Sequence, residues 1–431
     1  MKIAVIGAGM VGVAAAQAFA AEGCHVTVFE RRGSVAEETS FAPAGIAASG
    51  LAAPWRTPAG RLPWGRDGEV PGMYETGAAF ASRSLLGGGR GAAQAVRNAE
   101  RALALRGLIE HGVERIDGLA QKLNLDFERD RGLLVTLADA PTAAQAEIAM
   151  DWLAQAGETV EWVDAERQRR LEPGRALPDG EPRAIYLPDA LVGNTREWTQ
   201  LLRAKAQSQG VRFLFLHEVM SLSPGARPTL RYWTGPRDGR GAEPHEAQFD
   251  AIIVCAALDS ARLVAPLGVK LPWRAVRGCS VTAPLHLREA TPDIGPRAAV
   301  LDVRSGIAIT RLGTRVRVSG GHEIVPRGAA AAAVPEAPEP KALQPLYDAL
   351  DTDFPGAVHW PKAQAWQAAR PVLADGLPAV GASGAEGIWL NVGHAHHGWP
   401  LSQVAAEALC AMVARQTPRV HVGALSPQRL G

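Results

Sequence analysis

Cysteine is scarce in this 431-residue chain, and the net charge is close to zero. The four cysteines, Cys24, Cys255, Cys279 and Cys410, form no C-x-x-C pair. Their spacing signals neither a zinc site nor a disulfide framework, and it favours a reducing, intracellular compartment. A formal charge of +1 also argues against nucleic-acid binding, which needs a strongly basic face. We therefore expect no metal site and no nucleic-acid partner.

Lysine is rare as well, since six lysines leave 39 of the 45 basic residues as arginines. The planar guanidinium group pairs with two carboxylate oxygens at once, so arginine suits carboxylate recognition. Most of these arginines must nevertheless be ordinary surface charge. The count alone assigns a role to none of them.

Long apolar runs are almost absent, and only residues 3–21 form an uncharged stretch near membrane-spanning length. A signal peptide or membrane anchor is one interpretation of this stretch. The other is a buried strand at 2–6, a glycine-rich turn at 7–12 and a small-residue helix that ends at Gly23. We favour the second interpretation because the next segment of the chain has the pattern of a strand that ends in an acidic residue.

This second strand, at 25–29, ends in Glu30, which lies 18 residues past Gly12. That is close to the separation of about 20 residues expected for a ribose-binding carboxylate. In this context the G-x-G-x-x-G pattern predicts a dinucleotide site. Gly7 permits the tight turn, Gly9 lets the backbone approach the pyrophosphate, and Gly12 allows close helix–sheet packing. Glu30 would repel a 2′-phosphate, which favours FAD or NAD over NADP.

The rest of the chain predicts an α/β fold. Helical patterns at 97–123, 142–156 and 195–209 are interspersed with short apolar strands, whereas residues 274–319 alternate with period two. We expect a discontinuous Rossmann-like domain interleaved with an α+β substrate domain built on an antiparallel sheet. The predicted dinucleotide-binding domain comprises residues 1–90, 186–265 and 366–431, and the predicted substrate domain comprises 91–185 and 266–365.

Four segments resemble one known family, and they occur in the family's order along the chain. They are ETSFAPAG at 38–45, RGCSVTAP at 277–284, WQAARP with DGLP within 366–378, and NVGH with GW within 391–399. Together they resemble the D-amino-acid oxidase, glycine oxidase and sarcosine oxidase family, in particular its bacterial D-amino-acid dehydrogenase small-subunit type. This family resemblance covers nearly the whole chain.

The resemblance implies that the first domain binds FAD non-covalently. The turn would hold the pyrophosphate, Glu30 with Arg31 the adenosine ribose, and the backbone at Val219 the adenine. Segments near Gly45 and Gly393 would line the isoalloxazine ring. The residues implied to bind FAD are Gly7, Gly9, Met10, Val11, Gly12, Glu30, Arg31, Thr39, Ser40, Ala44, Gly45, Val219, Gly393, Gly398, Trp399 and Pro400.

Arg370 is the residue that the resemblance implies for substrate recognition. In the oxidase branch the arginine of the matching R-P pair clamps the substrate carboxylate. Oxidation would pass the Cα hydrogen as hydride to flavin N5, so that bond must be held over the ring. The imine so formed would hydrolyse to a 2-oxo acid and ammonia. The alternative is that Arg370 makes a structural salt bridge.

A histidine-rich loop departs from the family pattern. His394, His396 and His397 occupy a stretch where relatives have a second glycine and non-histidine residues. These histidines would serve a proton relay or bind an acidic side chain, or they would only hydrogen-bond within the loop. No acidic or cysteine partner has the local spacing of a metal site.

The expected function is that of an FAD-dependent dehydrogenase or oxidase acting on the C–N bond of amino acids, with D-amino acids favoured. Two alternatives stay open: an oxidase of N-substituted or cyclic amino acids, and a flavin-carrying subunit of a larger complex. The electron acceptor, quinone or oxygen, is open, and so are the oligomeric state and the side chain of the substrate. We expect a cytoplasmic protein and leave open a peripheral contact with the inner face of the bacterial membrane.

Overall fold

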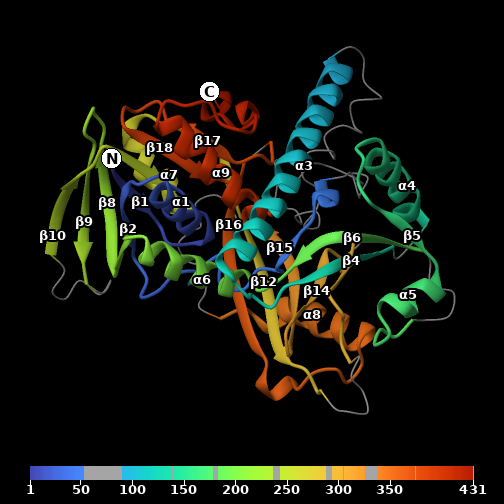
Figure 1. Cartoon of the computed structure of the whole chain (residues 1–431). Coiled ribbons are helices and arrows are strands. Elements are labelled where there is room, and N and C mark those ends of the chain that lie inside the picture. Colours follow the sequence, from blue (N-terminus) through green and yellow to red (C-terminus); the bar gives the residue numbers. More distant parts are fainter. Residues whose placement is uncertain are drawn as a thin grey trace.

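The computed structural model describes residues 1–52, 90–137, 140–177, 183–235, 243–287, 294–303, 305–325, 337–373 and 375–430. Figure 1 shows two sheet-based parts side by side, with the N-terminal strand inside one of them. A six-stranded sheet lies toward the left and a nine-stranded sheet occupies the lower centre and right. The segment 55–91, which matches the family pattern poorly, lies almost entirely outside the described residues.

The six-stranded sheet is built around β1. Its order is β17 (Ala379–Ala382), β18 (Ile388–Val392), β11 (Ala251–Val254), β1 (Lys2–Ile6), β2 (His25–Glu30) and β7 (Arg212–Phe215). All neighbours are parallel except β17 and β18. The four residues of β11 and the last four of β1 are buried, as expected of central strands covered on both faces.

Helices cover one face of this sheet and a small antiparallel sheet covers the other. One core joins Ile3, Val5 and Val28 to α1 (Met10–Ala21), α6 (Thr195–Ser208), α9 (Gly398–Val413) and part of α3 (Arg90–Leu123). A second core joins Phe29 to α7 (Asp259–Val264), β8 (His217–Ser223) and β9 (Thr229–Thr234). Strand β10 (Glu243–Gln248) completes the small sheet at the edge of the molecule (Figure 1).

The nine-stranded sheet is mostly antiparallel. Its order is β16 (Gln364–Leu373), β12 (Trp273–Pro284), β15 (Arg315–Ile324), β14 (Ile307–Leu312), β13 (Ala299–Asp302), β4 (Asp130–Thr136), β6 (Ala184–Val192) and β3 (Ile46–Ala47), with β5 (Glu161–Val163) paired to β6. Only β13 and β4 run parallel. Its helices are α4 (Ala140–Gln155), α5 (Ala165–Leu171) and α8 (Pro340–Asp353).

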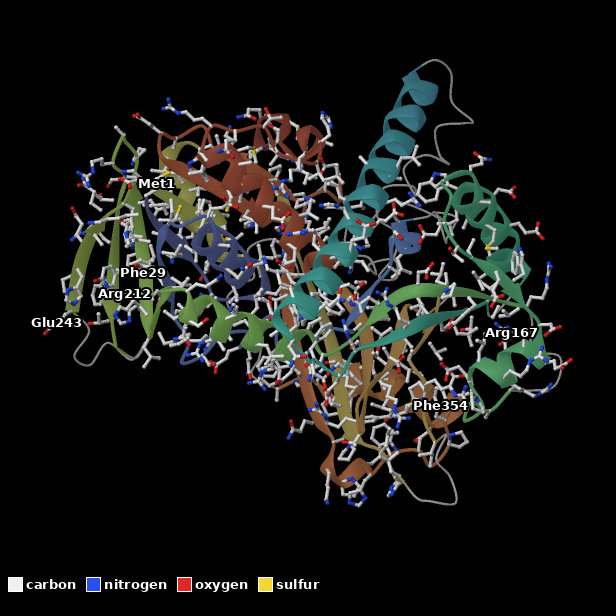
Figure 2. The ribbon with its side chains drawn as sticks, in the orientation of Figure 1. Met1, Phe29, Arg167, Arg212, Glu243 and Phe354 are labelled. Atoms are coloured by element: carbon white, nitrogen blue, oxygen red, sulfur yellow. The ribbon has the colours of Figure 1, made fainter. Side chains whose placement is uncertain are left out.

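Short 3-10 turns join several of these elements. They are Ser49–Ala52, Ala265–Leu267, Trp360–Lys362, Gly423–Leu425 and Pro427–Leu430. Figure 2 shows Phe29 in the part that holds the six-stranded sheet and Phe354 in the part below the nine-stranded sheet. The two side chains belong to separate cores.

The predicted fold class is confirmed, and the expected strand, helix and strand form at β1, α1 and β2 within the first 30 residues. The helix expected from residue 97 begins earlier, at Arg90. The domain boundaries stay a prediction. Strands β6 and β16 cross the boundaries drawn at 185/186 and 365/366, and β3 pairs within the nine-stranded sheet although it falls in the predicted dinucleotide-binding domain. No described helix is both long and apolar enough to span a bilayer.

Candidate active site

The glycine-rich turn links β1 to the N-terminus of α1. A Cβ atom at Gly12 would lie 1.9 Å from the carbonyl oxygen of Gly7, and one at Gly7 would lie 2.6 Å from that of Cys255. The fold itself therefore requires glycine at both positions. Gly9 is different: its φ is −69°, and a Cβ there would approach only Ser40 Oγ, at 3.2 Å. Packing within the protein alone does not explain glycine at position 9.

The N-terminus of α1 is open to an anion. Gly9 is the N-cap residue and supplies no side-chain hydrogen bond, and the first turn carries no acidic residue. Ser40 Oγ accepts a hydrogen bond from Met10 N at 3.1 Å, which ties the 39–45 segment to the helix. Free N–H groups and the helix dipole at such an end attract phosphate.

Glu30 lies at the end of β2, beside this turn. Its Oε2 accepts a hydrogen bond from Ala8 N and its Oε1 accepts one from Arg32 N, both at 2.7 Å. Burial raises the pKa of the carboxyl group, although the two N–H donors oppose the rise. Each oxygen keeps a lone pair for a further donor, which suits a ribose hydroxyl.

Arg31 is held by acidic side chains. It pairs with Glu38 at 2.5 Å and also with Asp259, and the pKa of Glu38 is lowered by Arg31 and Arg32 despite burial. Together with Glu30 and Val219, these side chains line a cavity of about 100 Å³. The carbonyl oxygen of Val219 accepts a hydrogen bond from Arg262 at 3.1 Å.

A larger cavity of about 190 Å³ adjoins the first, because Gly9, Thr39 and Ser40 line both. An elongated ligand that passes over the turn would enter both cavities. Gly45 stands where the larger cavity meets the nine-stranded sheet, and its φ is +76°. A Cβ atom there would lie 2.3 Å from the carbonyl oxygen of Gly193, so only glycine fits.

The predicted cofactor residues converge on these two cavities. Gly12 and Pro400 are exceptions, since neither lines them: Gly12 packs beneath the turn, and the backbone of Pro400 lies against Gly112 of α3. The predicted residues that line one or both cavities are Gly7, Gly9, Met10, Val11, Glu30, Arg31, Thr39, Ser40, Ala44, Gly45, Val219, Gly393, Gly398 and Trp399.

Buried polar atoms without a hydrogen-bond partner gather around the larger cavity. They include Nε1 of Trp366 and Trp399, both polar side-chain atoms of Asn391, Nε2 of His394 and Oγ of Ser319. Folded proteins leave few such atoms unsatisfied, so their concentration here fits a polar ligand. With the open helix N-terminus and the Glu30 oxygens, these residues fit FAD.

Arg370 enters the larger cavity from β16 and meets the histidine-rich loop. Its Nη2 donates a hydrogen bond to His396 Nδ1 at 2.9 Å. An acceptor at Nδ1 places the ring proton of neutral His396 on Nε2. Burial, reinforced by the Arg370 charge, holds the pKa of His396 well below its usual range, so the ring is neutral.

A fourth histidine, His322, belongs to this group. It projects from β15, and its ring packs edge-on against His396 with centroids 5.6 Å apart. Burial and the nearby Arg370 hold the pKa of His322 well below its ordinary value. His322 was not among the residues predicted from the sequence. In the sequence, His322 stands near the end of a segment with period-two alternation. That pattern does not show which residues of the neighbouring strand and loop lie beside it.

The remaining loop histidines are also buried and neutral. Burial lowers the pKa of His394 to about 3 and that of His397 to about 4, with Arg370 adding to the effect at His397. His394 is bridged to Val372 of β16 through the backbone, and His397 is the N-cap residue of α9. Among the residues that the structure describes, no cluster of His, Cys, Asp or Glu is arranged to hold a metal ion.

Comparison with known proteins identifies the family of the chain. The profile of the family described as "DAO: FAD dependent oxidoreductase" matches residues 2–412. A D-amino acid dehydrogenase of Cereibacter sphaeroides is 33% identical over all of this chain and 95% of its own, and one of Vibrio cholerae is 29% identical over 98% and 97%. The chain belongs to the DAO family of FAD-dependent oxidoreductases. It is an FAD-dependent enzyme.

Solved structures agree on the fold. Glycine oxidase from Geobacillus kaustophilus superposes with a TM-score of 0.75 at 17% identity, covering 99% of each chain. The L-amino acid deaminase from Proteus myxofaciens gives 0.73 at 15% identity, covering 100% of this chain and 93% of its own. Because one fold serves enzymes named for different substrates, the fold alone does not fix the substrate.

Proposed function

We propose that this enzyme oxidises amino acids at the Cα–N bond, with D-amino acids as its preferred substrates. The product would be an imine, which water converts to a 2-oxo acid and ammonia. One observation supports D-amino acids in particular, and a second supports a substrate that carries a carboxylate. The curated relatives that match the whole chain at about 30% identity carry the name D-amino acid dehydrogenase. The cavity also presents a guanidinium group, which is suited to a carboxylate.

The observation that carries the proposal is the position of Arg370. Its guanidinium lines the same cavity as Gly9, Ser40 and Gly45, where the cofactor residues converge. Bound FAD supplies the acceptor for the Cα hydrogen and its electron pair. Arg370 would hold the substrate carboxylate through two parallel N–H donors, and His396, as acceptor from Nη2, would fix the plane of the guanidinium.

The loop histidines are proposed to take up a proton from the substrate ammonium group. Hydride leaves Cα readily only when the nitrogen lone pair is available, so the amine must lose a proton first. His394, His396 and His397 are all buried and neutral. Because Nδ1 of His396 already accepts from Arg370, His394 and His397 are the proposed acceptors for the amine proton. Neutral rings also leave the positive charge of Arg370 undiminished for the carboxylate.

The electrons are proposed to pass to a quinone or to oxygen. We further propose a cytoplasmic enzyme. The support for a reducing compartment is that all four cysteines are free, and three of them are buried. Burial raises the pKa of the Cys279 thiol, which makes this cysteine a poor nucleophile and fits a packing role.

Steady-state kinetics of Arg370→Leu and Arg370→Lys test the proposal. A charged hydrogen bond is worth roughly 1.5–3 kcal/mol, so kcat/KM for amino acids should fall by about 10–150-fold in Arg370→Leu. Arg370→Lys should recover part of the loss through its charge alone. Both variants should keep FAD. Arg169→Leu, on the exposed side of α5, is the matched control and should behave as the parent. Unchanged kinetics in Arg370→Leu would overturn the assignment.

A further inference from the structure

A third cavity, of about 510 Å³, lies outside the active site, and three arginines line it. It is formed between the N-terminal turn of α6 and the edge of the nine-stranded sheet. Arg196 comes from α6, and Arg315 and Arg317 come from β15. Neither the cofactor nor the proposed substrate clamp uses these residues.

Arg317 is the central feature of this cavity, because it is a buried cation that pairs with no acidic side chain among the described residues. Only 5% of its surface is exposed. Its Nε donates to Thr282 Oγ1 at 2.9 Å and its Nη1 to the carbonyl oxygen of Pro43 at 3.1 Å. Within the described part of the chain, no carboxylate pairs with Arg317. A buried charge is costly unless it is paired, so the site calls for an anion.

The surrounding charges leave a positive excess. Arg315 is paired with Glu128 at 2.7 Å, whereas Arg196 forms no ion pair with any described residue. Among the described residues that line the cavity, Glu197 in the first turn of α6 is the one that is acidic. Burial, with Arg315 and Arg196 nearby, lowers the pKa of Arg317 to about 10 although Glu128 opposes the fall, so the side chain stays charged at neutral pH.

An aromatic stack forms the wall between this cavity and the active site. The Arg196 guanidinium lies 4.0 Å from the ring centroid of Phe41. Phe41 in turn stacks on Trp366 with centroids 4.1 Å apart. Trp366 lines both this cavity and the active-site cavity of about 190 Å³. Pro43, whose carbonyl oxygen accepts a hydrogen bond from Arg317, also lines the active-site cavity. A ligand on Arg317 would therefore touch the segment that carries Thr39 and Gly45.

We propose that this cavity is a second small-molecule site, which binds a small oxyanion at Arg317 and Arg196. The ligand chemistry is that of a carboxylate or a phosphate. Binding supplies the missing countercharge and stabilises the 39–45 segment against the nine-stranded sheet. The site is separate from Arg370, so an anion occupies it whether or not substrate is bound.

Thermal unfolding of the FAD-loaded enzyme, titrated with sodium phosphate or sodium acetate, tests the site. Sodium chloride at the same ionic strength is the reference. A ligand that binds only the folded state raises Tm as its concentration passes Kd. We expect one or both oxyanions to raise Tm beyond the chloride reference. Stronger binding of acetate identifies a carboxylate ligand, and stronger binding of phosphate a phosphorylated one.

Three variants locate the anion. Arg317→Lys and Arg196→Gln should each weaken its binding by about tenfold or more, because each removes charge-assisted hydrogen bonds. Arg370→Leu should leave the phosphate binding unchanged, together with the part of the acetate binding that is lost in Arg317→Lys and Arg196→Gln. If Arg317→Lys fails to retain FAD, the anion binding of Arg196→Gln alone tests the proposal. No stabilisation beyond the chloride reference would overturn the proposal. So would binding that is lost in Arg370→Leu and kept in Arg196→Gln.

Discussion

Replacing Gly9 by alanine adds one methyl group at the start of α1, in a backbone conformation that any residue adopts. The φ and ψ angles there are −69° and 176°. The nearest atom to the new Cβ would be Ser40 Oγ, at 3.2 Å, so a shift of a few tenths of an ångström accommodates it. Alanine also reduces the entropy of the unfolded chain, which offsets the contact by about 0.4–1 kcal/mol. The apoprotein should fold with nearly the parent stability.

FAD binding should respond differently. The methyl group would occupy the surface of the turn over which the pyrophosphate is expected to lie, and inserting a methyl into a closely packed contact costs about 1–3 kcal/mol. At about 1.4 kcal/mol per factor of ten, FAD affinity should fall by roughly 5–150-fold. The substitution should therefore weaken FAD binding and leave the stability of the apoprotein nearly unchanged.

Two measurements separate these effects: the Kd for FAD from titration of the apoprotein, and Tm of that apoprotein. Gly118→Ala in α3 is the matched control, since a Cβ there meets nothing within 4 Å. It should keep the FAD affinity and gain slightly in stability. Gly12→Ala, whose Cβ would lie 1.9 Å from a carbonyl oxygen, should lose both stability and FAD. If Gly9→Ala binds FAD as the parent does, the pyrophosphate does not lie on this turn.

Two further changes test the electrostatics and the capping of the fold. Burial raises the pKa of Glu172 from 4.5 to about 7, so the folded chain holds a proton that the unfolded chain releases between these pH values. Glu172 alone should therefore contribute a loss of stability of up to about 3 kcal/mol as pH rises from 4.5 to about 7, against the gain that the buried histidines contribute over the same range. Denaturant unfolding of the parent and of Glu172→Gln across this range should show that contribution as the difference between the two pH profiles. Asn194 caps α6 by accepting a hydrogen bond from Glu197 N at 3.2 Å. Asn194→Ala should cost about 1 kcal/mol in the same assay, and an unchanged midpoint would show that the cap contributes nothing.

The dinucleotide half of the site was predictable because its signal is local. The strand, the turn at Gly7 to Gly12 and the strand ending in Glu30 are contiguous, and each step follows from backbone sterics and burial. All three elements form where the sequence indicated. The spacing of the glycines in the sequence therefore predicts the turn that the structure contains.

The substrate half was less predictable because its neighbours are set by strand pairing. Val276 of β12 lies opposite Ile324 on one side and Arg370 on the other. An irregularity in register near Gly278 then brings His322 next to Arg370 and His396. Neither the pairing nor the irregularity leaves a readable signal in the sequence.

The arginine surplus illustrates the same limit. Composition counts 39 arginines but gives no burial for any of them. Only the folded chain separates an exposed side chain such as Arg169 from Arg317, which is 5% exposed and faces a cavity.

The most direct test of the account is anaerobic reduction of the purified, FAD-loaded enzyme by a panel of amino acids. D-amino acids should bleach the flavin absorbance, with their L-enantiomers far slower, and the product should be a 2-oxo acid with one equivalent of ammonia. Bleaching only by N-methyl or cyclic amino acids would contradict the proposed substrate class. Failure of every amine to bleach the flavin would contradict the proposed amino-acid oxidation itself.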